Sequence, residues 1–238
     1  MNRIGDLINQ HNPDNTKFRK LWEVTAWSKR FEGVKDSKQT KTIKYPYIEM
    51  ETLKGMEVSS GDVYLLTTGA YKGWTTQNIA REYLCEGEIV VIPVGGITSV
   101  KNIQYYNGKF VMANNNIVTS LDNEILNNKY LYYFLINNIN LIKSLFRGTG
   151  KKFPNMVEVL NIVIPIPPIE VQIEIAEILD TFTELETELE TELEAHRQQY
   201  AHYLNQLLGF DRQNINPEES LGDEYDLNQL LLPFMDAC

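Results

Sequence analysis

The chain is poor in cysteine, since Cys85 and Cys238 are the only two among its 238 residues. Two cysteines form no disulfide framework and no C-x-x-C metal motif, so an intracellular, reducing compartment is the simpler expectation. Residues 1–6 lack the apolar core of a signal peptide, and no apolar run reaches the roughly 18 residues of a membrane span. These absences predict a protein of the cytoplasm with no membrane segment.

Familiar catalytic motifs are also missing. The sequence holds no G-x-S-x-G, no glycine-rich phosphate loop followed by lysine and no H-E-x-x-H. The three asparagines at 114–116 lack the prolines and aromatic residue of the amino-methyltransferase motif, and no S-adenosylmethionine glycine motif occurs. Histidines are few, and Asp62 and Cys85 have none nearby. We therefore expect no catalysis, no cofactor and no metal in this chain, and an enzyme with an unrecognised site is the weaker alternative.

The charge is divided unevenly along the chain. The net charge is −10, from 22 basic and 32 acidic residues. Residues 1–160 hold 20 basic and 15 acidic residues, whereas residues 161–238 hold 2 and 17. The first part is therefore positive and the second strongly negative, which indicates two electrostatically different pieces.

Short apolar runs between turn residues predict a β-rich region in the first part. The expected strands are 45–50, 63–67, 88–93, 103–106 and 109–113, and Asn107-Gly108 is a strong hairpin signal between the last two. Helical periodicity follows over 123–146 with a break at Asn137-Asn138, and 157–164 is expected to be one more strand. With a short helix at 1–10, residues 1–168 are expected to form one mixed, β-rich domain of an α+β protein.

A long helix is expected to follow this domain. No glycine or proline occurs from Ile169 to Leu208, and these 40 residues would span about 60 Å as a helix. Alternating steps of three and four residues give it heptad character, and the sequence Thr-Glu-Leu-Glu repeats three times over 183–194. The stripe comprises Leu179, Phe182, Glu186, Leu189, Leu193, His196, Tyr200, Tyr203 and Leu207.

Glutamates of the repeat stack at i,i+4, and each like-charged pair costs about 0.2–0.5 kcal/mol. We therefore expect a helix-pairing role, against the plainer alternative of an acidic face on a surface helix. Residues 211–238 read as an acidic tail.

Three basic or mixed polar clusters in the first part suit nucleic-acid binding. Lysines and arginines crowd residues 29–44, hydroxyls, glycines and aromatics follow a strand at 67–74, and a basic loop occupies 147–152. Such loops can contact phosphates and send one or two side chains to base edges. The alternative is ordinary solubilising lysines and turns. The candidate DNA-contacting residues are Lys29, Arg30, Lys35, Thr68, Tyr71, Lys72, Trp74, Arg147, Thr149, Lys151 and Lys152.

Several segments, in this order and spacing, match one family. They are Asn12-Pro13-Asp14 with residues 17–24, Ser60-Gly61-Asp62-Val63 within 60–69, Gly148-Thr149-Gly150 with Phe153-Pro154, residues 160–172, and residues 178–180 with 197–210. The chain resembles a specificity (S) subunit of a type I restriction-modification system in a half-length form. One departure is Val171, which stands where the family usually has glutamate before glutamine.

This resemblance implies a target recognition domain over 1–168, a conserved spacer and dimerisation helix over 169–210, and a tail over 211–238 without a family counterpart. Two copies would pair through an antiparallel, intermolecular coiled coil to read a bipartite, palindromic site on double-stranded DNA, with the repeats as a spacer. The dimerisation residues would be Leu179, Phe182, Leu189, Leu193, Tyr200, Tyr203 and Leu207.

The same resemblance implies that partner methyltransferase (modification) subunits bind S-adenosylmethionine, and that a restriction subunit can join them. Two alternatives stay open: pairing with a different specificity subunit, and a half-subunit that modulates assembly without reading DNA.

Overall fold

The structure is a computed structural model that describes residues 16–67, 71–94, 102–148 and 153–208. The expected helix at 1–10, the tail at 211–238, Thr68, Thr149, Lys151 and Lys152 lie outside the described residues. The chain divides into two units, residues 1–183 and 184–238. The first unit holds the sheet-rich domain and the first turns of the long helix, and the second holds the rest of that helix.

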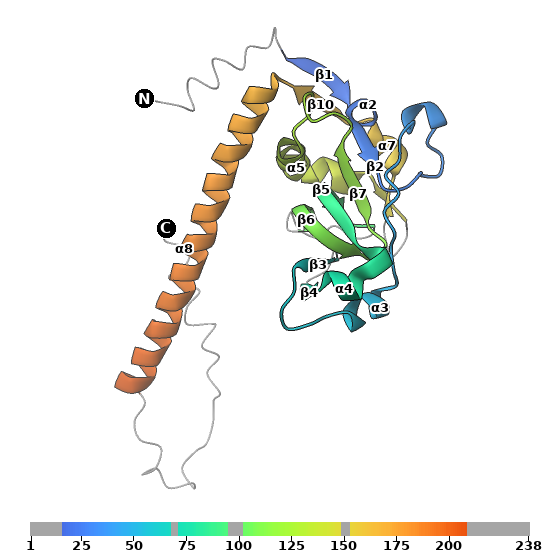
Figure 1. The fold of residues 1–238 in the computed structure, drawn as a ribbon. Coiled ribbons are helices and arrows are strands. Elements are labelled where there is room, and N and C mark those ends of the chain that lie inside the picture. The colour runs from blue at the N-terminus through green and yellow to red at the C-terminus, as the bar shows by residue number, and fades with distance from the viewer. Residues whose placement is uncertain (1–15, 68–70, 95–101, 149–152, 209–238) are drawn as a thin grey trace. The chain divides into compact units, whose positions relative to one another are not determined.

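The domain is built on a six-stranded sheet in the order β2-β7-β5-β6-β3-β4 (Figure 1). All neighbouring strands are antiparallel except β3 and β6. These strands are β2 (Thr25–Trp27), β3 (Val63–Leu66), β4 (Gly73–Thr75), β5 (Cys85–Ile92), β6 (Gln104–Met112) and β7 (Asn116–Ser120). Two ribbons lie outside the sheet: β1 (Lys17–Lys20) with β10 (Val163–Ile166), and β8 (Phe146–Arg147) with β9 (Phe153–Pro154).

Short helices surround the sheet, and one long helix follows it. They are α2 (Leu21–Val24), α3 (Met50–Gly55), α4 (Gln77–Ala80), α5 (Asn128–Asn137), α6 (Ile139–Ser144), α7 (Met156–Leu160) and α8 (Ile169–Leu208). The expectation of an α+β domain followed by a long helix is confirmed, and α8 has the expected bounds. Within the described parts of the chain, no helix combines the length and the apolar character that crossing a membrane requires.

The expected hairpin at Asn107-Gly108 is wrong. Residues 104–112 form the single strand β6, which pairs with β5 along its length. Gly108 faces Gly87 in this ladder and has a φ of +143°, a conformation that side chains disfavour. Gly108 therefore provides a backbone conformation within a continuous strand and does not form a turn.

Two other expected strands are also wrong. Residues 45–50 form only one isolated bridge, between Tyr47 and Met112, because Pro46 lacks the amide hydrogen that a continuous ladder needs. Residues 157–164 contain the end of α7 and the start of β10. Met156, Val159 and Leu160 are buried at helical spacing, so the apolar run has a period of 3.6 rather than 2.

The main core lies between the sheet and helices α5 and α7. Val90, Val118 and Leu131 belong to this cluster and are fully buried. The Asn127 side chain caps α5 by accepting from the backbone N–H groups of Lys129 and Tyr130. The expected break is confirmed, since α5 ends before Asn138 and α6 begins after it, with the Asn138 amide donating to the Phe134 carbonyl.

The first turns of α8 are fastened to the domain by buried polar contacts. The Gln172 side chain is fully buried and accepts from the Asn127 N–H at 2.9 Å. Its amide nitrogen donates to the carbonyls of Ile125 and Pro167, both at 2.8 Å. About two helical turns further along α8, the Asp180 carboxylate accepts hydrogen bonds from the Lys129 ammonium at 2.5 Å and from the Tyr133 hydroxyl at 2.7 Å. Residues 169–183 therefore belong to the domain.

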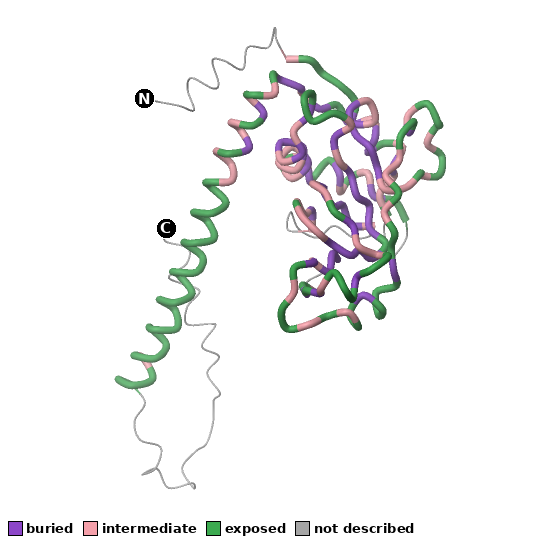
Figure 2. The backbone as a smooth tube through the Cα atoms, in the orientation of Figure 1, coloured by how far each residue is buried: buried purple, intermediate pink, exposed green. Residues whose placement is uncertain are grey.

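The remainder of α8 is exposed along almost its whole length. From Glu184 to Leu208 every residue is exposed except Leu204, which is half-buried (Figure 2). The exposed residues include the large apolar side chains Leu189, Leu193 and Tyr200. A helix with such a stripe gains stability when another surface covers it.

Replacing Gln172 with methionine is expected to destabilise the domain by about 1–3 kcal/mol, because the Asn127 N–H and the carbonyls of Ile125 and Pro167 lose their partner at nearly constant volume. Urea denaturation of the full chain measures this change. The control is Gln198→Met, since Gln198 is exposed on the same helix and contacts only Glu194, at 3.3 Å. Equal stability of the two variants would show that the hydrogen bonds of Gln172 do not stabilise the junction between the domain and α8.

Candidate nucleic-acid interface

Side chains from three loops meet where strands β2, β3 and β6 end. We call residues 28–29, 67, 71–72, 104 and 113–115 the loop edge. The Lys29 ammonium donates to the Asn114 side-chain oxygen at 2.8 Å, which links the β2 loop to the loop after β6. The Asn115 amide donates to the Leu66 carbonyl at 3.2 Å, and the Thr67 hydroxyl donates to the Tyr71 carbonyl at 2.9 Å. The sheet topology thus gathers residues that are far apart in the sequence.

Lys29 is the half-buried cation of this edge. Partial burial lowers its pKa, because a charged ammonium loses water when it is covered. Lys72, which directly precedes β4, is exposed. An exposed lysine on a loop suits contacts to a phosphate backbone.

Tyr71 supports the loop rather than presenting its hydroxyl to a ligand. Its hydroxyl donates to the Glu57 carboxylate at 2.8 Å, and the Lys54 ammonium lies 5.5 Å from the ring centre. Loss of solvent and the bond to Glu57 raise the pKa of Tyr71 to about 12, so the hydroxyl stays a donor at neutral pH. Tyr71 is a sequence candidate for DNA contact, but in the structure its hydroxyl is bonded to Glu57 of the same chain.

Trp74 stands on β4 beside other aromatic side chains. Its ring centre is 5.3 Å from that of Tyr64, which in turn stacks on Tyr106 at 5.1 Å. Trp74 is 46% exposed, so the stack ends at the surface. Close to it, a Cβ on Gly61 would lie 2.1 Å from the Thr75 carbonyl oxygen, which explains why the Ser-Gly-Asp segment needs glycine.

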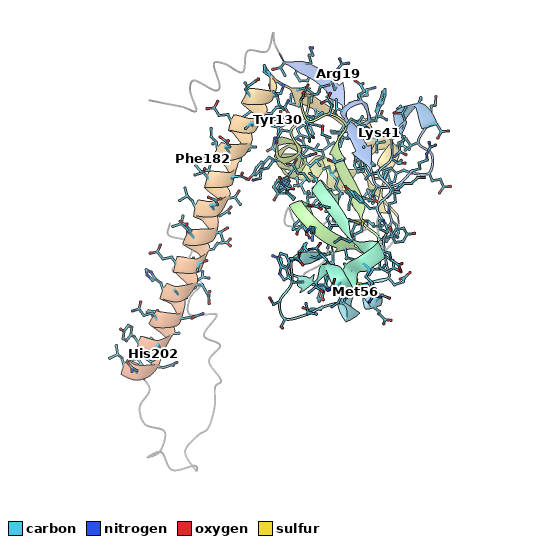
Figure 3. All side chains as sticks on the ribbon, in the orientation of Figure 1. Arg19, Lys41, Met56, Tyr130, Phe182 and His202 are labelled. Carbon is cyan, nitrogen blue, oxygen red and sulfur yellow. The ribbon has the colours of Figure 1, made fainter. Side chains whose placement is uncertain are left out.

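The basic loop over 29–44 packs against α7. The Lys38 ammonium donates to the Asn161 side chain at 2.8 Å, and a Cβ on Gly33 would lie in ordinary contact with Val157 at 3.5 Å. Arg30 forms an ion pair with Asp36, and Lys35 is exposed. Lys41, on the same loop, is labelled in Figure 3. Part of this loop's charge is thus neutralised internally, and Lys35 and Lys41 are exposed.

Arg147 lies elsewhere, in the β8–β9 ribbon. Its guanidinium donates to the Ser144 carbonyl at 2.7 Å, and its strand partner Phe153 is 47% exposed. The described sequence candidates therefore fall in four places. Lys29, Tyr71 and Lys72 belong to the loop edge, Arg30 and Lys35 lie on the basic loop, Trp74 lies on β4, and Arg147 lies on the β8–β9 ribbon.

Sequence reasoning missed two amide side chains at the loop edge. Asn114 is exposed, and Gln104 is half-exposed with its amide donating to the Thr67 carbonyl at 2.9 Å. Amides offer a donor and an acceptor together, the pattern that adenine presents in the major groove. Only the asparagine run at 114–116 signals this in the sequence.

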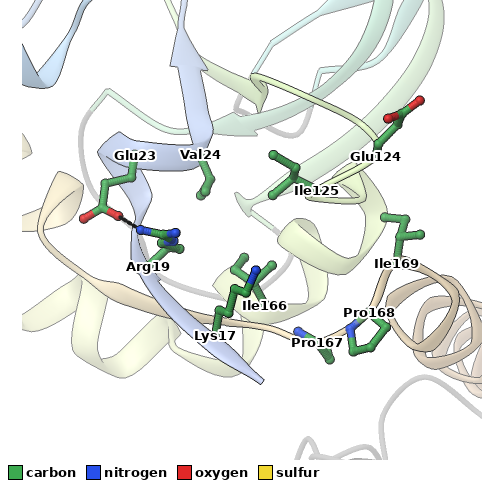
Figure 4. A pocket seen from close by; sticks show the side chains of 10 residues that line it. All are labelled: Lys17, Arg19, Glu23, Val24, Glu124, Ile125, Ile166, Pro167, Pro168 and Ile169. Atoms are coloured by element: carbon green, nitrogen blue, oxygen red, sulfur yellow. Dashed lines mark hydrogen bonds and ion pairs between the residues drawn. The ribbon is translucent and has the colours of Figure 1, made fainter. Parts of the chain in front are cut away.

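A hollow of about 450 Å³ lies at the other ribbon, between β1, β10 and the start of α8 (Figure 4). Lys17 and Arg19 line it together with Glu23 and Glu124, and Arg19 pairs with Glu23 at 3.5 Å. Two cations and two carboxylates balance each other, so this hollow has no excess of positive charge for a phosphate.

Basic and amide-bearing loops on a mixed sheet, followed by an acidic helix with an exposed apolar stripe, suit a nucleic-acid recognition module. The family model described as type I restriction modification DNA specificity domain matches residues 13–196. The chain therefore belongs to the family of type I restriction-modification DNA specificity proteins.

Two curated relatives carry matching names. A putative type I restriction enzyme specificity subunit of Haemophilus influenzae is 39% identical over 148 residues, which cover 58% of this chain and 38% of that protein. A putative type I specificity subunit of Mycoplasma pneumoniae is 33% identical over 165 residues, 67% of this chain and 42% of that protein. The chain thus spans about two fifths of the length of these relatives.

A solved structure shows the same fold. The crystal structure of the type I restriction-modification S subunit from M. genitalium superposes with a TM-score of 0.53 at 19% identity, covering 85% of this chain and 48% of that chain. The chain is therefore similar to this S subunit in its fold as well as to the family in its sequence.

Replacing Lys72 with alanine is expected to weaken binding to any DNA duplex and to reduce the slope of log affinity against log salt by about 1, because one phosphate contact is lost. Fluorescence anisotropy at several salt concentrations measures both quantities. Lys20→Ala is the control, since Lys20 is an exposed strand lysine on the β1–β10 ribbon. Equal slopes for the two variants would remove Lys72 from the interface.

Proposed function

We propose that this chain is a DNA-reading half-subunit of a type I restriction-modification methyltransferase, and that two copies together read one bipartite, palindromic site. The observation that carries the proposal is the family match over residues 13–196 on a chain with one recognition domain and one long helix. A two-fold dimer presents two identical reading surfaces in inverted orientation, so its half-sites are inverted copies.

The loop edge supports the reading role. Lys29 and Lys72 supply charge for phosphates, and Asn114 supplies an amide for a base edge. The domain's positive charge favours DNA, whereas the acidic helix repels it. This division supports DNA recognition by the domain and protein contacts by the helix.

The exposed stripe of α8 supports dimerisation. Its members Phe182, Leu189, Leu193, Tyr200, Tyr203 and Leu207 are exposed, and Leu179 is half-buried. A second copy supplies a matching stripe and shields these side chains from water. Methyl transfer then belongs to methyltransferase subunits that bind S-adenosylmethionine, and a restriction subunit adds cleavage.

The test is a map of methylated bases in DNA from cells that express this chain together with its methyltransferase subunit. We expect an interrupted palindrome that disappears when this chain is omitted. An interrupted motif without symmetry would replace the homodimer with a heteromeric pair. Absence of any motif, with the two proteins still co-purifying, would reject the reading role in favour of an assembly modulator.

Deleting one Thr-Glu-Leu-Glu unit, residues 187–190, is expected to shorten the spacing between the half-sites by nearly two base pairs, because four residues contribute about 6 Å of helix and one base pair about 3.4 Å. Both half-sites should stay unchanged. Methylation mapping of the deletion variant gives the spacing directly. An unchanged spacing would contradict the role of the helix as a ruler.

A further inference from the structure

The stripe on α8 has two polar interruptions, Glu186 and His196. All other stripe positions from Leu179 to Leu207 are leucine, phenylalanine or tyrosine. Both interruptions are exposed and lie on the face that a partner helix would cover. A polar side chain inside an apolar seam lowers stability unless it meets a suitable partner, so such residues fix the register of paired helices.

Antiparallel pairing brings the two interruptions together in one register only. When Glu186 faces His196 of the partner subunit, Leu189 faces the partner's Leu193 and Phe182 faces the partner's Tyr200. A slide of one heptad in either direction places Glu186 opposite a tyrosine or a leucine and leaves both polar groups unpaired. Parallel pairing places Glu186 against its own copy, where the two carboxylates repel each other.

The chemistry of this pair is favourable. A glutamate carboxylate accepts hydrogen bonds, and an imidazole has a ring N–H to donate in its neutral and its charged form. The two-fold axis produces the pair twice in each dimer. Matching polar groups therefore reward one register and penalise its neighbours.

An apolar groove on the domain lies beside Ile175 and the stripe residue Leu179. It has a volume of about 520 Å³ and lies between α5 and the first turns of α8. Tyr130 and Phe134 of α5 line it together with Ile175 and Leu179 of α8 (Tyr130 is labelled in Figure 3). The Tyr130 hydroxyl donates to the Pro165 carbonyl at 3.1 Å, so this polar group is already satisfied.

In the register set by Glu186 and His196, the C-terminal turns of the second helix reach this groove. The partner's Tyr203 comes opposite Leu179, and the partner's Leu207 comes opposite Ile175. Leu207 is 78% exposed on its own chain. The groove and the exposed end of α8 therefore complement each other in position and in apolar character.

We propose that α8 of a second copy of this chain binds antiparallel in the register that pairs Glu186 with His196 of the partner subunit, and that its Tyr203 and Leu207 fill the groove between α5 and α8. The proposal rests on the homodimer of the proposed function and adds its register and its docking site. Each recognition domain is then held by both helices of the dimer.

Disulfide cross-linking of the full chain tests the register. In a Cys238→Ser background, a Phe182→Cys chain is mixed with a differently tagged Tyr200→Cys chain under mild oxidation. The remaining Cys85 is buried and does not compete. We expect a cross-link between the two different chains, and little between two copies of either, whose cysteines lie about 27 Å apart along the antiparallel pair.

Two further mixtures serve as register controls. In the first, a Phe182→Cys chain is mixed with a Leu207→Cys chain, and in the second it is mixed with a Leu193→Cys chain. Either mixture would cross-link only if the second helix were shifted by one heptad from the proposed register. Strong cross-linking in either, or between two Phe182→Cys chains, would overturn the proposed register. A chain that is dimeric by sedimentation but cross-links elsewhere refutes the register alone, whereas a monomer with no methylated palindrome refutes the proposed function as well.

Charge exchange and a groove variant test the contacts themselves. His196→Glu places two carboxylates opposite each other twice and should weaken self-association by more than about tenfold, and adding Glu186→His should restore it.

Leu207→Ala should weaken self-association by about tenfold. Leu208→Ala should leave it unchanged, because Leu208 is 64% exposed but lies beside the stripe. Equal effects of the two leucine variants would remove Leu207 from the groove.

Discussion

The buried amide of Gln172 is the contact on which the junction between the domain and its helix depends. It bonds to the start of α5 through Asn127, to the preceding loop through Ile125 and to the proline segment through Pro167. Three chain segments therefore share one side chain, which bonds a backbone N–H and two carbonyls at once. Asp180 adds an ion pair and a tyrosine contact two turns later. The helix consequently begins as a part of the domain core.

Charge separation explains why one chain contains two such different parts. The domain carries the positive loops that DNA requires, and six glutamates of the repeat make α8 unsuitable for DNA. The same glutamates destabilise the isolated helix through like-charged neighbours. A helix of this composition is best stabilised by burial of its leucine and tyrosine stripe, so helix pairing and folding of α8 support each other.

Short sequence patterns correctly predict those helices and breaks that depend on residues close together in the sequence. The absence of glycine and proline gives the bounds of α8, and asparagine gives the break at Asn138. The Asn107-Gly108 signal fails because β6 is held by long-range pairing with β5, which outweighs a turn propensity. The candidate site divides in the same way. Lys29 and Lys72 are identifiable as basic loop residues, but the contact between Lys29 and Asn114 follows from strand order.

A small reading surface gives a physical reason for two copies. Each good base contact discriminates by about 1–3 kcal/mol, and the loop edge of one domain offers few side chains that can make one. A genome presents about 10⁶ or more competing sites, so a single domain with a few contacts discriminates too weakly. In the proposed dimer, two domains on an antiparallel pair of helices would add their contacts and also require the correct spacing. In this arrangement the helix contributes to specificity as directly as the loops do, because a half-site at the wrong distance contributes no binding energy from the second domain.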